Sequence, residues 1–355
     1  MTFVDVLNFI WPILVAIIVF CLIITIHEFG HFIVAKLFKV KVNEFAVGFG
    51  PALFKKQKGE TLYALRLLPI GGYCAMEGED EESTDERAFC KAKVYKRILI
   101  VAAGAVFNII LGFLIMVVIV SMQPRLTTNK IGEFVDGAVS NTGTTPLKID
   151  DSIISINGRK IYSPDDISYM LGNDFDGVVS MTVERDGKKV SLDKVKFNLQ
   201  EYEGRNVISL DFRLYGENNN FFVTMKQSFL RTVSMGRLVW MSLIDLVSGK
   251  YGLNDLSGPV GVTKVVSGAV SSIAVDGVAG LLYLLRILCM ITVNLGIFNL
   301  LPIPALDGSR ILFLVIEGIR KKPVKHEAIV HAIGMGLLLL LMAVLVVKDL
   351  WQWIA

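Results

Sequence analysis

The sequence has few charged residues, and it lacks the cysteine pairs and the basic patches that mark several protein classes. Only 19% of its 355 residues are charged, and the formal net charge of +3 is too small to indicate nucleic-acid binding. The four cysteines are scattered without a C-x-x-C pair, so no disulfide framework is expected. No Lys or Arg precedes Lys36, so the first apolar stretch lacks the basic start of a signal peptide, and we expect it to remain in the mature protein.

Long apolar runs take the place of charge, and the mean hydropathy of +0.57 indicates that much of the chain lies in lipid. Four runs predict membrane-spanning helices, at residues 11–38, 98–122, 281–301 and 328–347. Basic residues follow the first run, precede the second and lie between the third and the fourth. Because Lys and Arg favour the cytoplasmic side, we expect both termini and the segment 123–280 on the outer face.

The first run contains the motif His27-Glu28-Phe29-Gly30-His31. On a helix of 3.6 residues per turn, His27 and His31 lie one turn apart on the same face, where both imidazoles can reach one Zn²⁺. Glu28 stands beside them as a general base for metal-assisted hydrolysis. Two core histidines with an unrelated glutamate are the alternative, but three ionisable groups in one membrane span are costly unless they have a function. The motif therefore predicts a hydrolytic zinc site.

A hydrolytic zinc usually has three protein ligands and a water, so one further ligand is required. Asp307 follows the third run, in a segment whose two prolines end regular helix. We expect it level with the two histidines, toward the cytoplasmic leaflet, where coordination would remove the desolvation cost of a lone carboxylate. A helix-end cap among the headgroups is the alternative role for Asp307.

Polar residues interrupt other apolar or amphipathic segments. Gly104 and Asn108 in the second run are predicted to serve helix packing, with a site role for Asn108 as the alternative. His326 and His331 are five residues apart, a poor spacing for sharing a metal, so we expect them at the membrane interface. Residues 221–247 have apolar residues at helical spacing with charges between them, which predicts a helix that lies at the interface.

A β-hairpin associated with the membrane is predicted between the first two runs. Residues 61–68 and 73–76 flank the turn-forming residues 69–72. Such a sheet is possible at membrane depth only where protein or water satisfies its backbone. Its free edge can take an unwound substrate as an added strand, and an ordinary hairpin that covers hydrophobic surface is the alternative of equal weight.

Residues 124–205 have the composition of a soluble domain, with charges, turn residues and short β-type runs. The runs cover residues 131–135, 152–156, 178–185 and 190–199. Residues 147–161 resemble the central hairpin of PDZ domains of the bacterial protease type, with residues 163–171 as the following helix. Asp150 stands where that family usually has Gly. We therefore expect an inserted, extracytoplasmic PDZ-like domain.

Several motifs, in order along nearly the whole chain, resemble those of the site-2 protease family of intramembrane zinc metalloproteases. The resemblance is to the bacterial type, which cleaves anti-sigma factors and signal-peptide remnants. Its motifs are His27–His31, 48–51 (Gly-Phe-Gly-Pro), 66–73 (Arg-Leu-Leu-Pro-Ile-Gly-Gly-Tyr), the PDZ-like insert, 257–261 (Ser-Gly-Pro-Val-Gly) and 299–308 (Asn-Leu-Leu-Pro-Ile-Pro-Ala-Leu-Asp-Gly). Two features depart from the pattern: some relatives have two PDZ domains, and Ser309 replaces a common Gly.

The resemblance implies His27, His31 and Asp307 as ligands of Zn²⁺, with Glu28 as the catalytic base. It also implies substrate contacts near the metal and along the hairpin. The corresponding residues here are Asn294, Asn299, Pro302, Pro304, Leu65, Leu67, Gly71 and Gly72.

The expected protein is an α-helical polytopic membrane protein with four transmembrane helices, a membrane-associated β-hairpin and a PDZ-like insert. We expect it in a bacterial cell membrane, where it cleaves the transmembrane segments of single-pass proteins. The expected divisions are residues 1–123 with the first two spans, 124–205 with the PDZ-like domain, 206–280 with an interfacial linker, and 281–355 with the last two spans. A PDZ-bearing adaptor with a structural zinc is the alternative function, and a metal transporter is a weaker one because few polar residues line the other spans.

Overall fold

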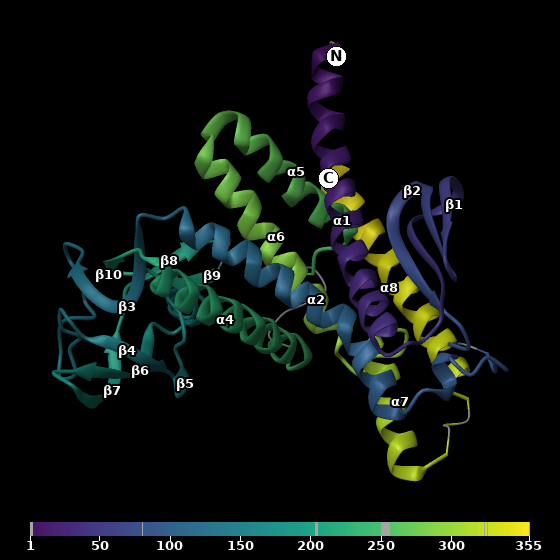
Figure 1. Ribbon diagram of the computed structural model, residues 1–355. Helices are drawn as coiled ribbons and strands as arrows, with labels where there is room; N and C mark the ends of the chain where they lie inside the picture. The colour runs from purple at the N-terminus through teal and green to yellow at the C-terminus, as the bar shows by residue number, and fades with distance from the viewer. Residues whose placement is uncertain are drawn as a thin grey trace. The chain divides into compact units, whose positions relative to one another are not determined.

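The computed structural model describes residues 3–79, 81–202, 205–249, 256–322, 324 and 326–354 (Figure 1). The chain divides into two compact units. The first unit joins residues 1–112 to residues 245–355, and the second unit comprises residues 113–244. Residues 203, 204 and 250–255 fall within the expected PDZ-like domain and linker but lie outside the described residues. The sequence-based divisions at 123, 205 and 280 stay predictions.

Long apolar helices dominate the first unit. Its helices are α1 (Phe3–Leu37), α2 (Val94–Ser121, which continues into the second unit), α5 (Pro259–Asp276), α6 (Val278–Asn299), α7 (Asp307–Arg320) and α8 (Glu327–Ile354), with a short 3-10 helix at Phe89–Lys91. Among the described residues, four stretches are long and apolar enough to cross a membrane: Trp11–Leu37, Val94–Ser121, Val278–Asn299 and Glu327–Gln352. These stretches coincide with the four spans predicted from the sequence.

Small residues allow α2 to pack closely against α1 and α6. A Cβ atom added at Gly30 of α1 would lie 2.5 Å from the Ala103 carbonyl oxygen of α2. A Cβ atom added at Gly296 of α6 would lie 2.8 Å from the Ala105 carbonyl oxygen. In membranes, helices associate mainly where small residues let their backbones approach each other. α2 therefore contacts α1 and α6 at positions that are only two residues apart, Ala103 and Ala105.

The sequence did not predict α5, which pairs with α6 as a helical hairpin joined at Gly277 (Figure 1). Within the motif at residues 257–261, Pro259 is the first residue of α5 and Gly258 is its N-cap. Proline suits this position because its missing N–H would have no partner inside the helix. Ala16 of α1 packs with buried apolar residues of α5 and α6, which fixes this pair against the first span.

A bent two-stranded sheet follows α1, formed by β1 (Val42–Lys58) and β2 (Thr61–Met76). The predicted hairpin turn at residues 69–72 is wrong, because these residues lie inside β2, and the chain turns at Gly59–Glu60 instead. Both strands fold over, so residues 44–47 pair with residues 62–65 on one side and with residues 72–75 on the other. Glycines with positive φ inside the strands permit this bend, namely Gly48, Gly50 and Gly71.

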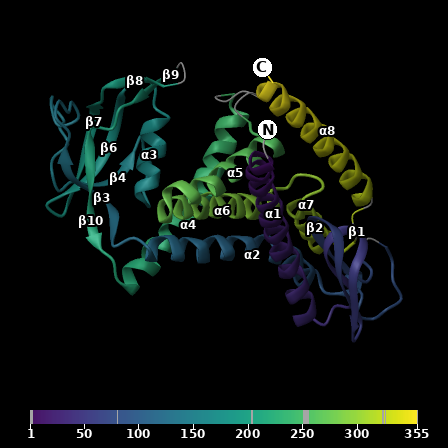
Figure 2. The ribbon, with the colours of Figure 1, turned by 90° about the horizontal axis from the view of Figure 1, so that it is seen from above.

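The second unit contains a β-sheet with the strand order β10-β3-β4-β6-β7, in which β5 also pairs with β4. The strands are β3 (Arg125–Phe134), β4 (Ser152–Ile156), β5 (Arg159–Lys160), β6 (Val178–Arg185), β7 (Lys188–Lys196) and β10 (Phe212–Asn218), with a separate hairpin of β8 (Leu199–Tyr202) and β9 (Arg205–Ile208). Helix α3 (Pro164–Gly172) lies against one face of the sheet (Figure 2). The four predicted strand regions and the predicted helix are confirmed, whereas β10, which pairs with β3, was not predicted.

Helix α4 (Phe221–Val247) follows β10 and belongs to the second unit up to residue 244, and its polar residues contact α3 and the segment before it. Ser234 donates a 2.6 Å hydrogen bond to Asp166 of α3, and the Arg237 guanidinium lies 5.2 Å from the centre of the Tyr162 ring. Large apolar side chains such as Phe222 and Trp240 are exposed. Arg237, one of the charged residues on which the prediction of an interfacial helix rests, therefore contacts the protein itself. The placement of α4 at a membrane surface stays a prediction.

Candidate metal centre

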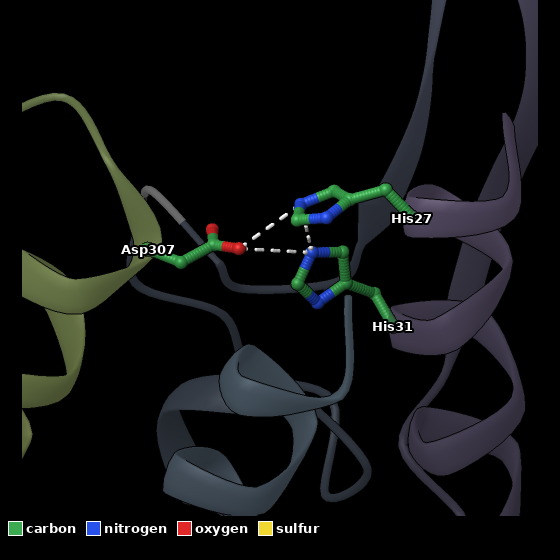
Figure 3. Close-up of side chains that lie close together, drawn as sticks. All are labelled: His27, His31 and Asp307. Atoms are coloured by element: carbon green, nitrogen blue, oxygen red, sulfur yellow. Dashed lines mark hydrogen bonds and ion pairs between the residues drawn. The ribbon is translucent and has the colours of Figure 1, made fainter. Parts of the chain in front are cut away.

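His27, His31 and Asp307 converge in the first unit (Figure 3). The two histidines project from successive turns of α1, and Asp307 is the first residue of α7. The His27 Nε2 and His31 Nε2 atoms are 3.1 Å apart. The Asp307 Oδ2 atom is 3.0 Å from His27 Nε2 and 3.3 Å from His31 Nε2. Three atoms that can ligate a metal thus form a nearly equilateral triangle.

The size and chemistry of this triangle fit a zinc ion. Because Zn–N and Zn–O bonds are about 2.0–2.1 Å long, the ligand atoms of a tetrahedral zinc stand roughly 3.3–3.4 Å apart. The observed separations of 3.0, 3.1 and 3.3 Å lie close to that spacing. Two imidazoles and one carboxylate leave a fourth position for water. This set of donors is typical of hydrolytic zinc sites, whereas structural zinc sites are closed by four protein ligands.

Helix α2 orients His31. The His31 Nδ1–H group donates a 2.9 Å hydrogen bond to the Ile100 carbonyl oxygen, which leaves Nε2 as the free ligand atom. Gly104 makes room for both imidazoles, because a Cβ atom there would lie 2.3 Å from His31 Nε2 and 2.7 Å from a His27 ring carbon. The prediction that Gly104 serves helix packing therefore covers only part of its role.

Asn108 lies one helical turn beyond Gly104 and contacts the other histidine. Its side chain is fully buried, and its Nδ2 atom is 3.4 Å from His27 Nδ1. The Asn108 Oδ1 atom is also buried and has no hydrogen-bond partner within the described part of the chain. A half-turn of the amide would let Oδ1 accept from His27 Nδ1–H and free Nε2 for the metal. The packing role predicted for Asn108 is thus incomplete. The four-residue spacing of Gly104 and Asn108 places both on one face of α2, and this was the signal in the sequence for their shared contact with the histidines.

The approach of Asp307 depends on the end of α6. Pro302 and Pro304 cannot continue a helix, and Gly308 packs so closely that a Cβ atom would lie 2.2 Å from the Leu301 carbonyl oxygen. The chain therefore reverses within a few residues and starts α7 at Asp307.

Ion pairs hold α7 against the rest of the first unit. Arg97 of α2 binds the Glu317 carboxylate through two hydrogen bonds, one of 3.1 Å between Nη1 and Oε2. Arg310 of α7 binds Glu79, which follows β2. Both cations are anchored by carboxylates on other segments, so the helix that carries the third ligand is fixed at its start and near its end.

Glu28 lies on α1 beside the two histidines and is half-buried. It interacts electrostatically with His31, His27 and Asp307. Its position is that of the glutamate in the H-E-x-x-H motif, where the carboxylate acts on the water at the metal. The predicted base is therefore close to the predicted ligands.

The residues predicted to contact substrate near the metal lie on α6 and the loop that follows it. Asn294 is half-buried, and its Oδ1 atom is buried without a hydrogen-bond partner among the described residues. Asn299 ends α6 and is half-buried, whereas Pro302 is exposed. Pro304 packs against Gly334 of α8. The substrate contact predicted for these residues stays a prediction.

The predicted substrate residues of the sheet fall into two groups. Leu65 and Leu67 have exposed side chains, whereas Gly71 and Gly72 are buried. The Gly71 carbonyl oxygen accepts a hydrogen bond from Cys21 of α1. Residues 72–76 pair with β1 on one side, and the described residues supply no strand on the other. This end of β2 is an edge beside the helix that carries the histidines.

Arg66 supports the same part of the sheet. Its guanidinium lies 5.4 Å from the centre of the Tyr73 ring and donates to Glu44 and to the Gly50 carbonyl oxygen. Burial, followed by the hydrogen bond to Glu44, raises the pKa of the Tyr73 hydroxyl, so this group stays neutral at physiological pH. One half-buried charge pair and an aromatic ring thus support the fold of β1 over β2.

Comparison with known proteins identifies the family. Residues 15–342 match the model of peptidase family M50. The chain belongs to this family. A protein of Fusobacterium nucleatum named as a zinc metalloprotease is 35% identical over 360 residues, which cover 96% of this chain and 98% of the relative. The "Regulator of sigma-W protease RasP" of Bacillus subtilis is 28% identical over 428 residues, with coverage of 96% and 99%, and the "Zinc metalloprotease RasP" of Geobacillus kaustophilus is 28% identical over 420 residues, with coverage of 95% and 97%.

The family and the apolar helices establish the class of the protein. It is a zinc metalloprotease of the site-2 type and a multi-pass membrane protein that works in the bilayer. The expectations of an enzyme and of zinc are confirmed. The adaptor with a structural zinc is therefore not favoured, and among the described residues only three candidate ligands gather at the centre, whereas a structural zinc site is usually closed by four.

Proposed function

We propose that this M50 peptidase hydrolyses peptide bonds within the transmembrane segments of single-pass membrane proteins. His27, His31 and Asp307 hold the zinc, and Glu28 is the catalytic base. The observation that carries the proposal is the triangle of ligand atoms, 3.0–3.3 Å on each side, formed by residues from opposite ends of the chain.

The chain's own residues supply the proton transfers. Bound zinc acts as a Lewis acid, lowering the pKa of a coordinated water and stabilising negative charge that develops on the substrate carbonyl. The Glu28 carboxylate accepts the proton of the attacking water and then delivers it to the leaving amine nitrogen. Asn108 and the Ile100 carbonyl oxygen keep the His27 and His31 rings in the orientation that points Nε2 inward.

The substrate helix must unwind before cleavage, because its carbonyl groups are hydrogen-bonded inside the helix. The unpaired edge of β2 at residues 72–76 supports strand addition, in which backbone hydrogen bonds hold the substrate extended. Leu65, Leu67, Gly71 and Gly72 belong to this element. Asn294, Asn299, Pro302 and Pro304 line the approach from α6, and the unpaired Asn294 Oδ1 atom supports a contact with substrate backbone.

The remaining parts of the proposal concern topology and substrate choice. Basic loops after α1 and after α7 support a cytoplasmic placement of these loops, with both termini and the second unit outside. The second unit acts as the PDZ-like domain, which excludes substrates whose outer part has not been trimmed. Anti-sigma factors and signal-peptide remnants are the proposed substrates, and the name of the Bacillus subtilis relative, a regulator of sigma-W, supports the first class.

The substitution Glu28→Gln tests the catalytic assignment. In purified protein with a model transmembrane substrate, we expect cleavage to fall by at least about 100-fold, since a positioned base contributes about 10²–10⁴-fold, while zinc stays bound. Glu86→Gln, at an exposed acid, is the matched control and should cleave normally. Zinc content is measured beside His31→Ala and Asp307→Ala, which should both lose metal. Unchanged cleavage by the zinc-loaded Glu28→Gln protein would falsify the assignment of the base.

A further inference from the structure

The loop that delivers Asp307 is held by α8, a helix that contributes no ligand. Within this loop, Ile303 donates a 2.7 Å hydrogen bond to the Leu301 carbonyl oxygen, and Leu306 donates one of 3.1 Å to the Ile303 carbonyl oxygen. Pro302 and Pro304 have no N–H group to donate. The Ala305 N–H group instead leaves the loop and donates a 3.2 Å hydrogen bond to His331 Nδ1 on α8.

Ala305 has a backbone conformation that needs such support. Its φ angle is +77°, in the left-handed region that residues with a Cβ atom seldom adopt. A non-glycine residue in this region is strained and persists only where its surroundings determine it. Because Ala305 is two residues before Asp307, a change in its φ angle would redirect the carboxylate. The hydrogen bond to His331 therefore acts where the direction of the third ligand is set.

His331 is itself held by a residue of α7 and by a residue one turn earlier on α8. Its ring centre lies 5.7 Å from that of Phe313 on α7, with the ring planes inclined by 61°. Its Nε2 atom is 3.7 Å from the Glu327 Oε1 atom one turn earlier on α8. With the Nε2 atom facing this carboxylate and Nδ1 accepting from Ala305, the imidazole is in the neutral tautomer that carries its proton on Nε2.

Gly334 brings α8 close enough for this contact. A Cβ atom added at Gly334 would lie 2.2 Å from Pro304 Cβ and 2.8 Å from the Pro304 carbonyl oxygen. Gly334 and His331 are three residues apart, on one face of α8. That face contacts residues 304 and 305 in succession. At Gly336, by contrast, an added Cβ atom meets nothing within 4 Å.

We infer that His331 is a positioning residue of the zinc centre, which fixes the left-handed turn at Ala305 and so directs Asp307 toward His27 and His31. The inference rests on the proposed ligand set. It replaces the expectation, drawn from the sequence, that His331 lies at the membrane interface. Through His331, α8 contributes to metal binding although it supplies none of the three proposed ligands.

Two measurements on the full chain in detergent test the inference. Chelator competition gives the zinc affinity, and the visible spectrum of the Co²⁺-substituted protein reports the geometry of the ligands. His331→Phe keeps a ring against Phe313 but removes the acceptor, and we expect zinc affinity to fall about tenfold or more with an altered Co²⁺ spectrum. His331→Asn places an amide oxygen close to the former Nδ1 position, and it should restore both readouts nearly to wild type. Equal losses in the two variants, or none in His331→Phe, would overturn the role of the hydrogen bond.

A second pair of variants covers the case in which His331→Phe does not fold. Gly334→Ala forces α8 away from Pro304 and should weaken zinc binding, whereas Gly336→Ala should bind as wild type does. Identical zinc affinity in these two proteins would also overturn the inference. Asp307→Asn is measured alongside them. If it binds zinc normally, the ligand assignment fails and the positioning role fails with it, whereas a loss in Asp307→Asn beside a normal His331→Phe rejects the positioning role alone.

Discussion

At the scale of single residues, the metal centre depends on groups of α2 that never touch the metal. Ile100 orients His31 through its carbonyl oxygen, Gly104 leaves space for both rings, and Asn108 contacts His27. In hydrocarbon, each imidazole needs a partner for its second nitrogen, because water is absent there. One face of α2 thus supplies a partner for each histidine.

Replacing Asn108 by Leu removes the partner of His27 while filling nearly the same volume. We expect zinc affinity to fall about 10–100-fold, as is usual when a residue behind a metal-bound histidine is lost. Chelator competition on the purified protein measures this. Val106→Leu, at an exposed position of the same helix, is the control. Normal zinc affinity in Asn108→Leu would show that His27 is oriented by other groups.

At the scale of elements, the spans were predictable because a run of about twenty apolar residues matches the thickness of the bilayer and is rare in water-soluble folds. Two helices of the first unit were missed for lack of such a signal. α5 has glycines and serines throughout and little apolar periodicity, and α7 is short and begins directly after two prolines. The ligand Asp307 was found from its chemistry, but the helix that it begins was not.

The sheet shows a different limit of sequence reasoning. Glycine and proline clusters at residues 48–51 and 69–72 are typical of turns, yet both lie inside long strands. Positive φ at Gly48 and Gly71 bends the strands without ending them. Which residues pair depends on contacts between strands, and local composition does not encode those contacts. The central strands of the second unit were easier to predict from the sequence, because alternating β-branched residues mark them directly.

The ion pair between Arg97 and Glu317 should make a measurable contribution to the docking of α7 on α2. Glu317→Leu leaves the buried Arg97 without its partner, and we expect the free energy of unfolding to fall by about 1.5–3 kcal/mol. The double variant Arg97→Met/Glu317→Leu should recover part of this loss, because no charge is left unpaired. Unfolding in mixed detergent micelles measures both. A double variant less stable than Glu317→Leu would contradict this account.

Two neighbouring acids of the second unit offer a matched comparison. Asp151 is fully buried and pairs with Arg185 at 2.7 Å, whereas Asp150 is exposed and pairs with Lys130 at the same distance. We expect Asp151→Asn to cost about 3–5 kcal/mol, since it leaves a partly buried guanidinium without its counter-charge. Asp150→Asn should cost less than about 1 kcal/mol, as exposed pairs do. Hydrogen exchange of β4 and β6 measures both, and similar protection in the two variants would contradict the prediction.

At the scale of the whole molecule, the membrane topology is open to a direct test. Cys90, between α1 and α2, is exposed, whereas Cys21, Cys74 and Cys289 are buried. We expect a membrane-impermeant maleimide to miss Cys90 in right-side-out vesicles and to label it after permeabilisation. Lys188→Cys in a Cys90→Ser background, at the exposed first residue of β7 in the second unit, should be labelled from outside. Labelling of Cys90 in intact vesicles would reverse the proposed orientation.

The metal centre draws its donors from the first helix and from one of the last two, so its assembly is tied to biosynthesis. While the ribosome is still adding the chain, α1 and α2 can enter the bilayer with both imidazoles and the glutamate already in place. The carboxylate that completes the triangle is translated only near the end. A chain that ends before residue 307 therefore carries the base and both imidazoles but lacks the third donor.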